Sequence, residues 1–206
     1  MFKKGASVFI ALLIFATGFF AGCNTNKKEN AGLNVESKVS AAVALPNEIN
    51  TPHTVNASGT IEVAFSPNGG GTESIIKAIG EAKISIRVQA YSFTSSPIAK
   101  ALLEAKKRGI DVRVILDKSQ ETEKYSSAKF FANNSIPTKI DHDFQIAHSK
   151  IMIIDEINVV TGSFNFTKSA EQNNAENVLV IRGNKELADL YVKNWEWRWG
   201  ETQDYK

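Results

Sequence analysis

The chain has 206 residues, which is enough for one domain of ordinary size and additional segments. Apolar residues make up 43% and charged residues 22%, which excludes a wholly disordered chain, a collagen-like chain and a multi-span membrane protein. The formal net charge of +2 does not by itself indicate a nucleic-acid partner. The single cysteine, Cys23, excludes an intramolecular disulfide.

Residues 1–22 predict an export signal. Lys3 and Lys4 precede an uncharged, apolar stretch at residues 5–22, and small residues lead into Cys23. This resembles the lipobox of bacterial lipoproteins, with Phe20 in place of the usual leucine, and it implies that Cys23 is lipidated. The stretch is also long enough for an uncleaved membrane anchor, and an ordinary cleaved signal is the third alternative. All three export the protein to the cell envelope.

Residues 23–57 predict a flexible tether ahead of a folded domain at 58–206. The tether is rich in Asn, Ala, Ser and Thr and has little apolar sequence. Removing residues 1–22 takes away two lysines and no acid, which leaves 22 basic and 22 acidic residues. Any electropositive site on the mature chain must therefore be local.

The folded domain begins with alternating strand and helix patterns. We expect a strand at 61–65, a helix capped by Thr72 and ending near residue 82, and a strand at 84–90. A helix then starts at Ser96-Pro97 and ends at Gly109, and a strand follows at 110–116. A helix at 124–133 and a short strand at 136–140 continue the pattern. This order favours parallel crossovers.

The second half of the domain changes the pattern. Strands at 151–154 and 159–160 predict an antiparallel hairpin, followed by a strand at 178–181 and a helix at 184–199. In that helix, the spacing places Trp195 and Trp199 on the core face and Trp197 outside, which favours packing over a base-stacking platform. This order of strands and helices predicts an α/β fold with a mixed, mostly parallel β-sheet and helices on both faces.

The hairpin carries the chemistry. His148 and Lys150 are two residues apart on a strand, so their side chains point to the same face. A two-residue turn at Glu156-Ile157 would pair Lys150 with Ser163 and His148 with Asn165, whereas a three-residue loop would break this alignment. A cation and neutral donors around an imidazole suit an oxyanion such as phosphate. The alternative is a solvated hairpin face, but a buried sheet does not carry a lysine and a histidine without partners.

The spacing H-x-K-x4-D-x6-G-S-x-N, from His148 to Asn165, resembles the HKD signature of the phospholipase D superfamily. The similarity covers about residues 58–200 and extends to Phe65-Ser66-Pro67, Ala90–Thr94 and Ala175-Glu176-Asn177, as in the small, single-motif bacterial endonuclease branch. The resemblance implies a phospholipase D/nuclease fold and a phosphodiester hydrolase.

By the same resemblance, His148 is the nucleophile and forms a covalent phosphohistidine. Lys150, Ser163 and Asn165 would bind the phosphate oxygens, and Glu176 would bond the other ring nitrogen of His148. Asp155 would orient the site, although a plain turn aspartate is an equal alternative. No metal or cofactor is implied.

The chain carries one HKD motif, whereas the leaving oxygen needs a general acid and enzymes of the family that it resembles use a second motif histidine for this. The Asp141-His142-Asp143 sequence does not repeat the motif, and we interpret it as a loop rather than a metal cluster. The resemblance therefore implies a homodimer with the active site at its two-fold axis. An endonuclease acting on DNA or RNA is the first functional hypothesis. A phospholipase acting on membrane lipids and an idle binding module of the envelope are the alternatives.

Overall fold

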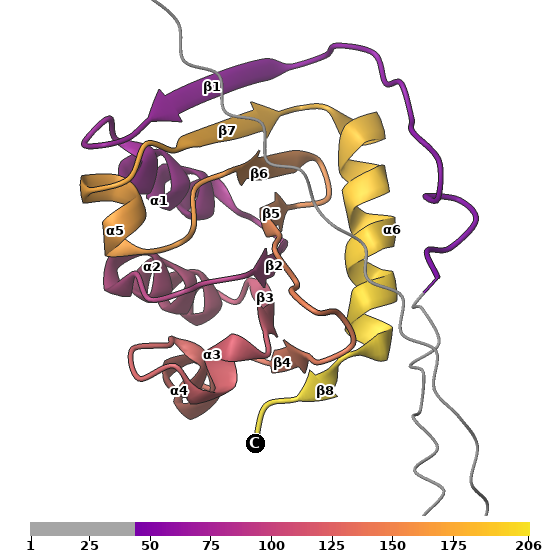
Figure 1. Cartoon of the computed structure of the whole chain (residues 1–206). Coiled ribbons are helices and arrows are strands. Elements are labelled where there is room, and N and C mark those ends of the chain that lie inside the picture. Colours follow the sequence, from indigo (N-terminus) through magenta and orange to yellow (C-terminus); the bar gives the residue numbers. More distant parts are fainter. Residues whose placement is uncertain (1–43) are drawn as a thin grey trace, which may run out of the picture. The chain divides into compact units, whose positions relative to one another are not determined.

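The computed structural model describes residues 44–206, so the predicted signal, Cys23 and the first part of the tether lie outside it. Its helices and strands, in chain order, are β1 (Thr60–Phe65), α1 (Gly71–Glu81), β2 (Ser85–Ala90), α2 (Ser96–Lys107), β3 (Asp111–Asp117), α3 (Ser119–Thr122), α4 (Ala128–Asn133), β4 (Thr138–Asp141), β5 (Lys150–Ile154), β6 (Asn158–Gly162), α5 (Lys168–Gln172), β7 (Asn177–Arg182), α6 (Lys185–Glu201) and β8 (Gln203–Asp204) (Figure 1). Among these helices, none is long and apolar enough to cross a membrane.

The strands form one eight-stranded sheet in the order β1-β7-β6-β5-β2-β3-β4-β8. The sheet is mixed, as expected, but the pairs β2–β3 and β3–β4 are parallel while the other neighbouring pairs are antiparallel. The parallel part is thus smaller than predicted. The difference arises at β1, which lies at the edge beside β7 instead of next to β2. β2 is almost wholly buried and needs a neighbour on each side, whereas β1 is mostly exposed and suits an edge.

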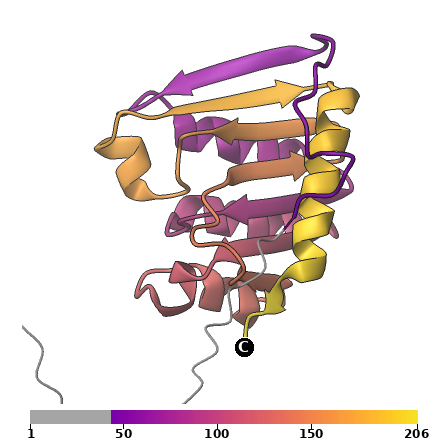
Figure 2. The same ribbon diagram turned by 45° about the vertical axis from the view of Figure 1, so that its right-hand side comes forward.

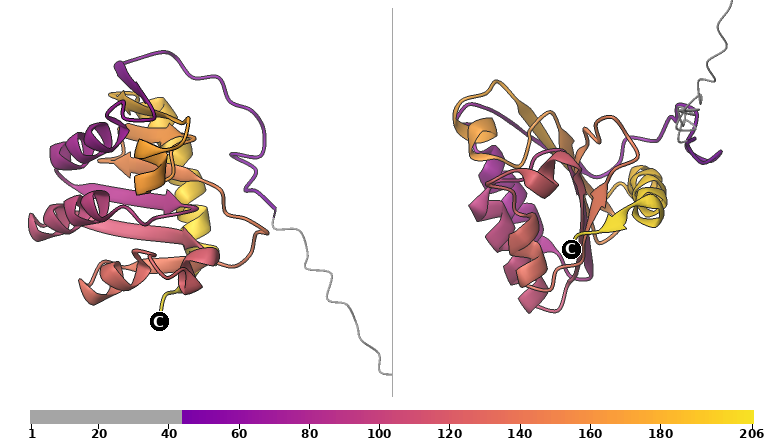
Figure 3. Two further views of the ribbon diagram at one scale, coloured as in Figure 1. Left: turned by 60° about the vertical axis from the view of Figure 1, so that its left-hand side comes forward. Right: turned by 60° about the horizontal axis from the view of Figure 1, so that its bottom comes forward.

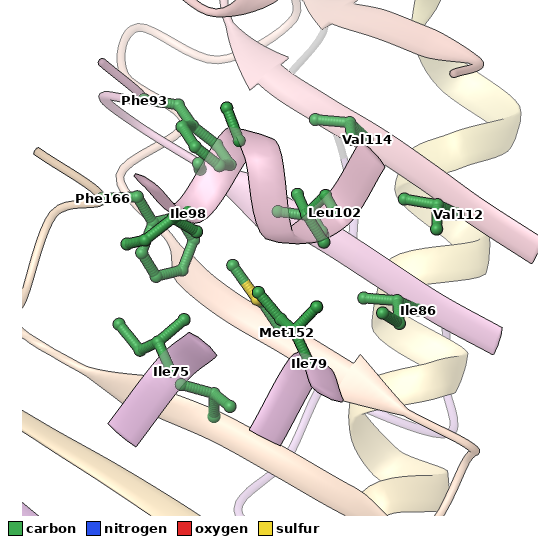
Figure 4. Packing of buried hydrophobic residues seen from close by; sticks show 14 of the residues in the cluster. Ile75, Ile79, Ile86, Phe93, Ile98, Leu102, Val112, Val114, Met152 and Phe166 are labelled. Carbon is green, nitrogen blue, oxygen red and sulfur yellow. The ribbon is translucent and has the colours of Figure 1, made fainter. Parts of the chain in front are cut away.

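Helices cover both faces of the sheet, as predicted. Helices α1, α2 and α4 lie on one face and α6 crosses the other (Figures 2 and 3). The main core lies between α1, α2 and the sheet, and it includes Ile75 of α1, Leu102 of α2 and Met152 of β5 (Figure 4). A smaller apolar cluster under α6 contains Ile115, Ile153 and Trp195.

Several helix boundaries differ from the prediction. Helix α1 begins at Gly71, and its first turn is capped from outside, because the Glu171 carboxylate accepts hydrogen bonds from the N–H groups of Gly70 (3.2 Å) and Thr72 (2.7 Å). Thr72 is therefore inside the helix and not its cap. Ser95, not Ser96, is the N-cap residue of α2.

The predicted helix at 124–133 is shorter in the structure. Its second half forms α4, and a separate turn of helix, α3, precedes it directly after β3. Strand β8 was not predicted either, because its two residues pair only through contact with β4. Short elements of this kind depend on tertiary contacts more than on local pattern.

The β5–β6 hairpin has a register one residue away from the predicted one. Met152 pairs with Val160 and Ile154 pairs with Asn158, so the turn holds three residues, 155–157, instead of two. Asp155 and Glu156 both have φ of 55°, in the left-handed region. By this register Lys150 falls opposite Gly162 and not opposite Ser163, so the predicted side-by-side pairs were wrong.

The described part of the predicted tether contacts the domain. Leu45, Ile49 and His53 line a pocket together with residues of α6. The Nδ2 of Asn184 donates a hydrogen bond to the carbonyl oxygen of Asn56 (3.0 Å). These contacts begin ahead of the predicted domain boundary at residue 58.

Helix α6 is held by its aromatic and basic residues. Trp195 is buried, donates its indole N–H to the carbonyl of Val88 (2.9 Å) and stacks on Trp199, which confirms the predicted packing. The buried Arg198 pairs with the buried Asp141 at 2.7 Å. This ion pair was not predicted, because the two residues lie 57 positions apart.

Replacing Arg198 by Met is expected to lower the free energy of unfolding by about 3–5 kcal/mol, because it leaves the Asp141 carboxylate buried without its cation. Urea unfolding of the two proteins measures the difference. The control is Arg113→Met, which breaks the exposed pair with Asp111 and should cost less than about 1 kcal/mol. Equal losses in the two variants would contradict this account of α6.

Candidate active site

The predicted site residues come from strand ends that meet at one edge of the sheet. His148 lies two residues before Lys150, which is the first residue of β5. Ser163 and Asn165 follow β6, while Glu176 directly precedes β7. Since β5 and β7 both run antiparallel to β6, the start of β5, the end of β6 and the start of β7 lie side by side.

Lys150 is buried, with 5% of its surface exposed. Its Nζ donates a hydrogen bond to the backbone carbonyl of His148 (2.7 Å) and lies 5.1 Å from the centre of the Tyr91 ring. Burial lowers the pKa of Lys150, and the negative charge of Glu176 partly offsets this. An ammonium has three donors, so this group retains capacity to bind an anion.

His148 is exposed, although its backbone is fixed. Its ring lies against the ring of Tyr91, with centroids 4.6 Å apart and planes tilted by 51°. The N–H of Tyr91 donates to the carbonyl of Ser149 (2.8 Å), which ties the segment to the end of β2. The imidazole is thus presented to solvent from a held backbone, as a nucleophile requires.

Gly162 allows the chain to pass close to β7. It has φ of 149°, and a Cβ at this position would lie 2.3 Å from the carbonyl oxygen of Asn177. The N–H groups of Ser163 and Phe164 both donate to this oxygen, at 3.1 and 3.2 Å. In return, the hydroxyl of Ser163 accepts a hydrogen bond from the N–H of Asn177 (3.1 Å). The close crossing fixes where the residues after β6 stand.

Asn165 and Glu176 complete the cluster in different ways. The side-chain oxygen of Asn165 is buried and has no hydrogen-bond partner among residues 44–206. The N–H of Glu176 donates to the hydroxyl of Ser66 (3.0 Å), and its carboxylate accepts from the amide of Asn174 (3.1 Å). Within the described chain, no hydrogen bond joins Glu176 to His148, so the bond implied by the family is not formed in this structure.

Asp155 does not join the cluster. It follows Ile154 at the other end of β5, roughly 16 Å along the strand from Lys150. Its carboxylate accepts hydrogen bonds from three consecutive backbone N–H groups, of Lys83 (2.9 Å), Ile84 (2.7 Å) and Ser85 (3.0 Å). These bonds support the alternative of a turn aspartate, and they explain the shifted hairpin register.

Tyr91 belongs to the site, although the sequence predicted no role for it. It contacts both His148 and Lys150, because Ala90 at the end of β2 pairs with Lys150. The neighbourhood of β2 and β5 could not be inferred from the strand pattern. In the Asp141-His142-Asp143 loop, both aspartates bind Arg198, and the described residues contain no group of three or more His, Cys, Asp or Glu that could hold a metal.

Replacing Asp155 by Asn is expected to lower the free energy of unfolding by about 1–3 kcal/mol, because part of the backbone N–H set loses its acceptor. Hydrolysis of bis(p-nitrophenyl) phosphate per folded molecule should stay within twofold of the wild-type rate. Chemical unfolding and the hydrolysis assay measure the two effects. A large loss of hydrolysis in a folded Asp155→Asn variant would contradict this prediction and show that Asp155 contributes to catalysis.

The sequence is similar to those of known proteins. The family model for the PLD-like domain of cardiolipin synthase matches residues 75–199. A phospholipase D of Rickettsia prowazekii is 43% identical over 135 residues, which are 66% of this chain and 65% of that protein. A mitochondrial cardiolipin hydrolase of dog is 31% identical over 68% of this chain and 55% of its own length. The chain thus spans a little less than two thirds of the length of the first relative and a little over half of the length of the second.

The solved structures agree as well. Nuc, a phospholipase D family member from Salmonella typhimurium, is 44% identical, with a TM-score of 0.69 over 71% of this chain and 98% of that chain. The mixed α/β fold predicted from the sequence is therefore confirmed. On the matched family model and this similarity, the chain belongs to the phospholipase D superfamily.

Proposed function

We propose that the protein is a phosphodiesterase that acts through a covalent phosphohistidine at His148. The observation that carries this proposal is the buried ammonium of Lys150 beside an exposed imidazole. A buried cation with unused donors is costly unless an anion occupies the site in the functional state. A phosphodiester supplies that anion and also the phosphorus that His148 can attack.

In the first step, a ring nitrogen of His148 forms a bond to phosphorus while the bond from phosphorus to the leaving oxygen breaks. Lys150, Ser163 and the amide of Asn165 hold the non-bridging oxygens, where negative charge develops. In the second step, water attacks phosphorus, the P–N bond breaks, and His148 is released with a phosphomonoester product. Lys150 supplies the cationic charge, so the mechanism we propose does not need a metal.

The leaving oxygen needs a proton, and we propose that a second copy of His148 provides it in a homodimer. In the described chain, His142 is exposed and lies 3.6 Å from Glu121, which leaves it committed elsewhere. Edge strand β1 carries an exposed apolar stripe, in which Ile61, Val63 and Phe65 alternate on one face and are 64%, 51% and 66% exposed. Such an apolar stripe supports association of two copies.

Two substrate classes remain as candidates. We propose nucleic acid first, because an exposed His148 suits a backbone phosphodiester lying across the surface. The second candidate is a membrane phospholipid, favoured by relatives named phospholipase D and mitochondrial cardiolipin hydrolase. The predicted lipid anchor at Cys23 would also place the site at a membrane, in the cell envelope.

The test compares the full chain with His148→Ala in the presence of a chelator. One assay follows nicking of plasmid DNA, and the other follows hydrolysis of cardiolipin and phosphatidylglycerol in vesicles. The substitution should lower turnover at least about 10³-fold in whichever assay is active, because it removes the nucleophile. Nicking that weakens steeply with salt supports the nuclease, whereas vesicle hydrolysis without nicking supports the lipid substrate. Activity that survives the substitution would contradict the mechanism.

Replacing Lys150 by Met is expected to abolish turnover and to leave the free energy of unfolding equal or up to about 2 kcal/mol higher, because a buried ammonium is lost. The lowered pKa of Lys150 means that the unfolded chain holds this proton more tightly. As pH rises from the pKa of Lys150 in the folded protein to its value of about 10.4 in the unfolded chain, the free energy of unfolding of the wild type should therefore increase relative to that of the variant. Urea unfolding between pH 7 and pH 10.5 measures this. A difference that does not change with pH would contradict the burial of the charge.

A further inference from the structure

His148 follows a segment that has no regular structure. Residues 142–149 connect β4 to β5, and most of them are exposed. A segment of this kind does not by itself hold a side chain within the few tenths of an ångström that an in-line attack needs. The position of the imidazole must therefore be fixed from another part of the chain.

The junction between β3 and α3 provides such a support. Asp117 ends β3 and is 2% exposed. One oxygen of its carboxylate accepts a hydrogen bond from the N–H of Ala147 (2.7 Å), the residue directly before His148. The other oxygen accepts from the N–H of Ser119 (2.9 Å). Each oxygen of this buried carboxylate thus accepts a hydrogen bond from a backbone N–H, and such charge-assisted bonds are strong.

The same junction holds the two neighbouring segments. The Nζ of Lys118 donates to the carbonyl of Phe144 (2.9 Å), within the segment that precedes His148. The buried side chain of Gln120 accepts from the N–H of Phe93 (3.0 Å), two residues after Tyr91, whose ring lies against His148. Residues 117–120 therefore bind both the segment that precedes His148 and the segment that follows Tyr91.

The neighbouring buried aspartate is used differently. Asp141 pairs with Asp117 across β3 and β4, and its charge is matched by Arg198. Asp117 has no cation within salt-bridge distance among the described residues and binds backbone N–H groups instead. Burying a carboxylate in this way is costly, and its one long-range bond reaches the residue next to the nucleophile.

We propose that Asp117 is a positioning residue for His148, which fixes the nucleophile by holding the N–H of Ala147. This inference rests on the proposed function, in which His148 attacks phosphorus. Asp117 touches neither substrate nor the imidazole, and it acts through the backbone. Its loss allows the imidazole to move, which slows attack while the oxygens of the phosphate are still bound by Lys150, Ser163 and Asn165.

The test compares Asp117→Asn with Asp155→Asn in the full chain. Both changes remove one carboxylate that binds backbone N–H groups, and Asp155 lies at the far end of β5 from His148. Steady-state hydrolysis of bis(p-nitrophenyl) phosphate is measured at a temperature where both are folded. The Asp117 variant should lose 10- to 100-fold in kcat with KM within threefold, and the Asp155 variant should keep both. Equal kcat values in the two variants would overturn the proposal.

A second measurement does not depend on activity or on a folded variant. In the wild-type chain, amide hydrogen exchange by NMR should show the Ala147 N–H strongly protected, unlike the amides of the exposed residues Gln145 and Ile146. Exchange of Ala147 as fast as that of its neighbours would overturn the proposal. If the wild-type chain exchanges as expected but hydrolyses no phosphodiester, then the proposed function fails and the positioning of His148 by Asp117 stands.

Discussion

The buried ammonium of Lys150 is the constraint on which the rest of the site depends. A cation at 5% exposure, with the carbonyl of His148 as its hydrogen-bond acceptor, costs free energy that a hydrophobic residue would not. Burial lowers its pKa, and the charge of Glu176 works in the other direction. The protein tolerates this cost at the position where β5 begins, near the Tyr91 ring that also contacts the imidazole of His148. We infer that the site is built for an anion.

The strand order explains how the chain assembles this site from distant segments. β5 is central, with β2 on one side and β6 on the other, so that Tyr91 and the residues after β6 flank the start of β5 from opposite sides. Gly162 then permits a close approach to β7, which brings Ser163 beside Asn177 and places Glu176 at the same edge. The helices on both faces keep these strands buried, and Arg198 of α6 binds both aspartates of the loop that leads to His148.

Much of the fold and the motif could be predicted from the sequence, whereas the contacts between distant segments could not. Alternation of apolar residues identified the central strands, and the spacing of His148, Lys150 and Asn165 identified the motif. The hairpin register was wrong, because it depends on the Asp155 carboxylate binding N–H groups some 70 residues earlier. The edge position of β1 and the roles of Tyr91, Asp117 and Arg198 were missed because they too depend on contacts between segments that are distant in the sequence. Local periodicity carries no information about which strands become neighbours.

The most direct test of the account is to detect the covalent intermediate. The full chain is mixed with a phosphodiester substrate, quenched in alkali, where phosphohistidine survives, and analysed by mass spectrometry of its peptides. We predict a phosphoryl adduct on His148 that forms and decays at rates compatible with turnover and is absent in His148→Ala. Turnover by the wild-type protein without any adduct on His148, under conditions that would trap it, would contradict the central claim.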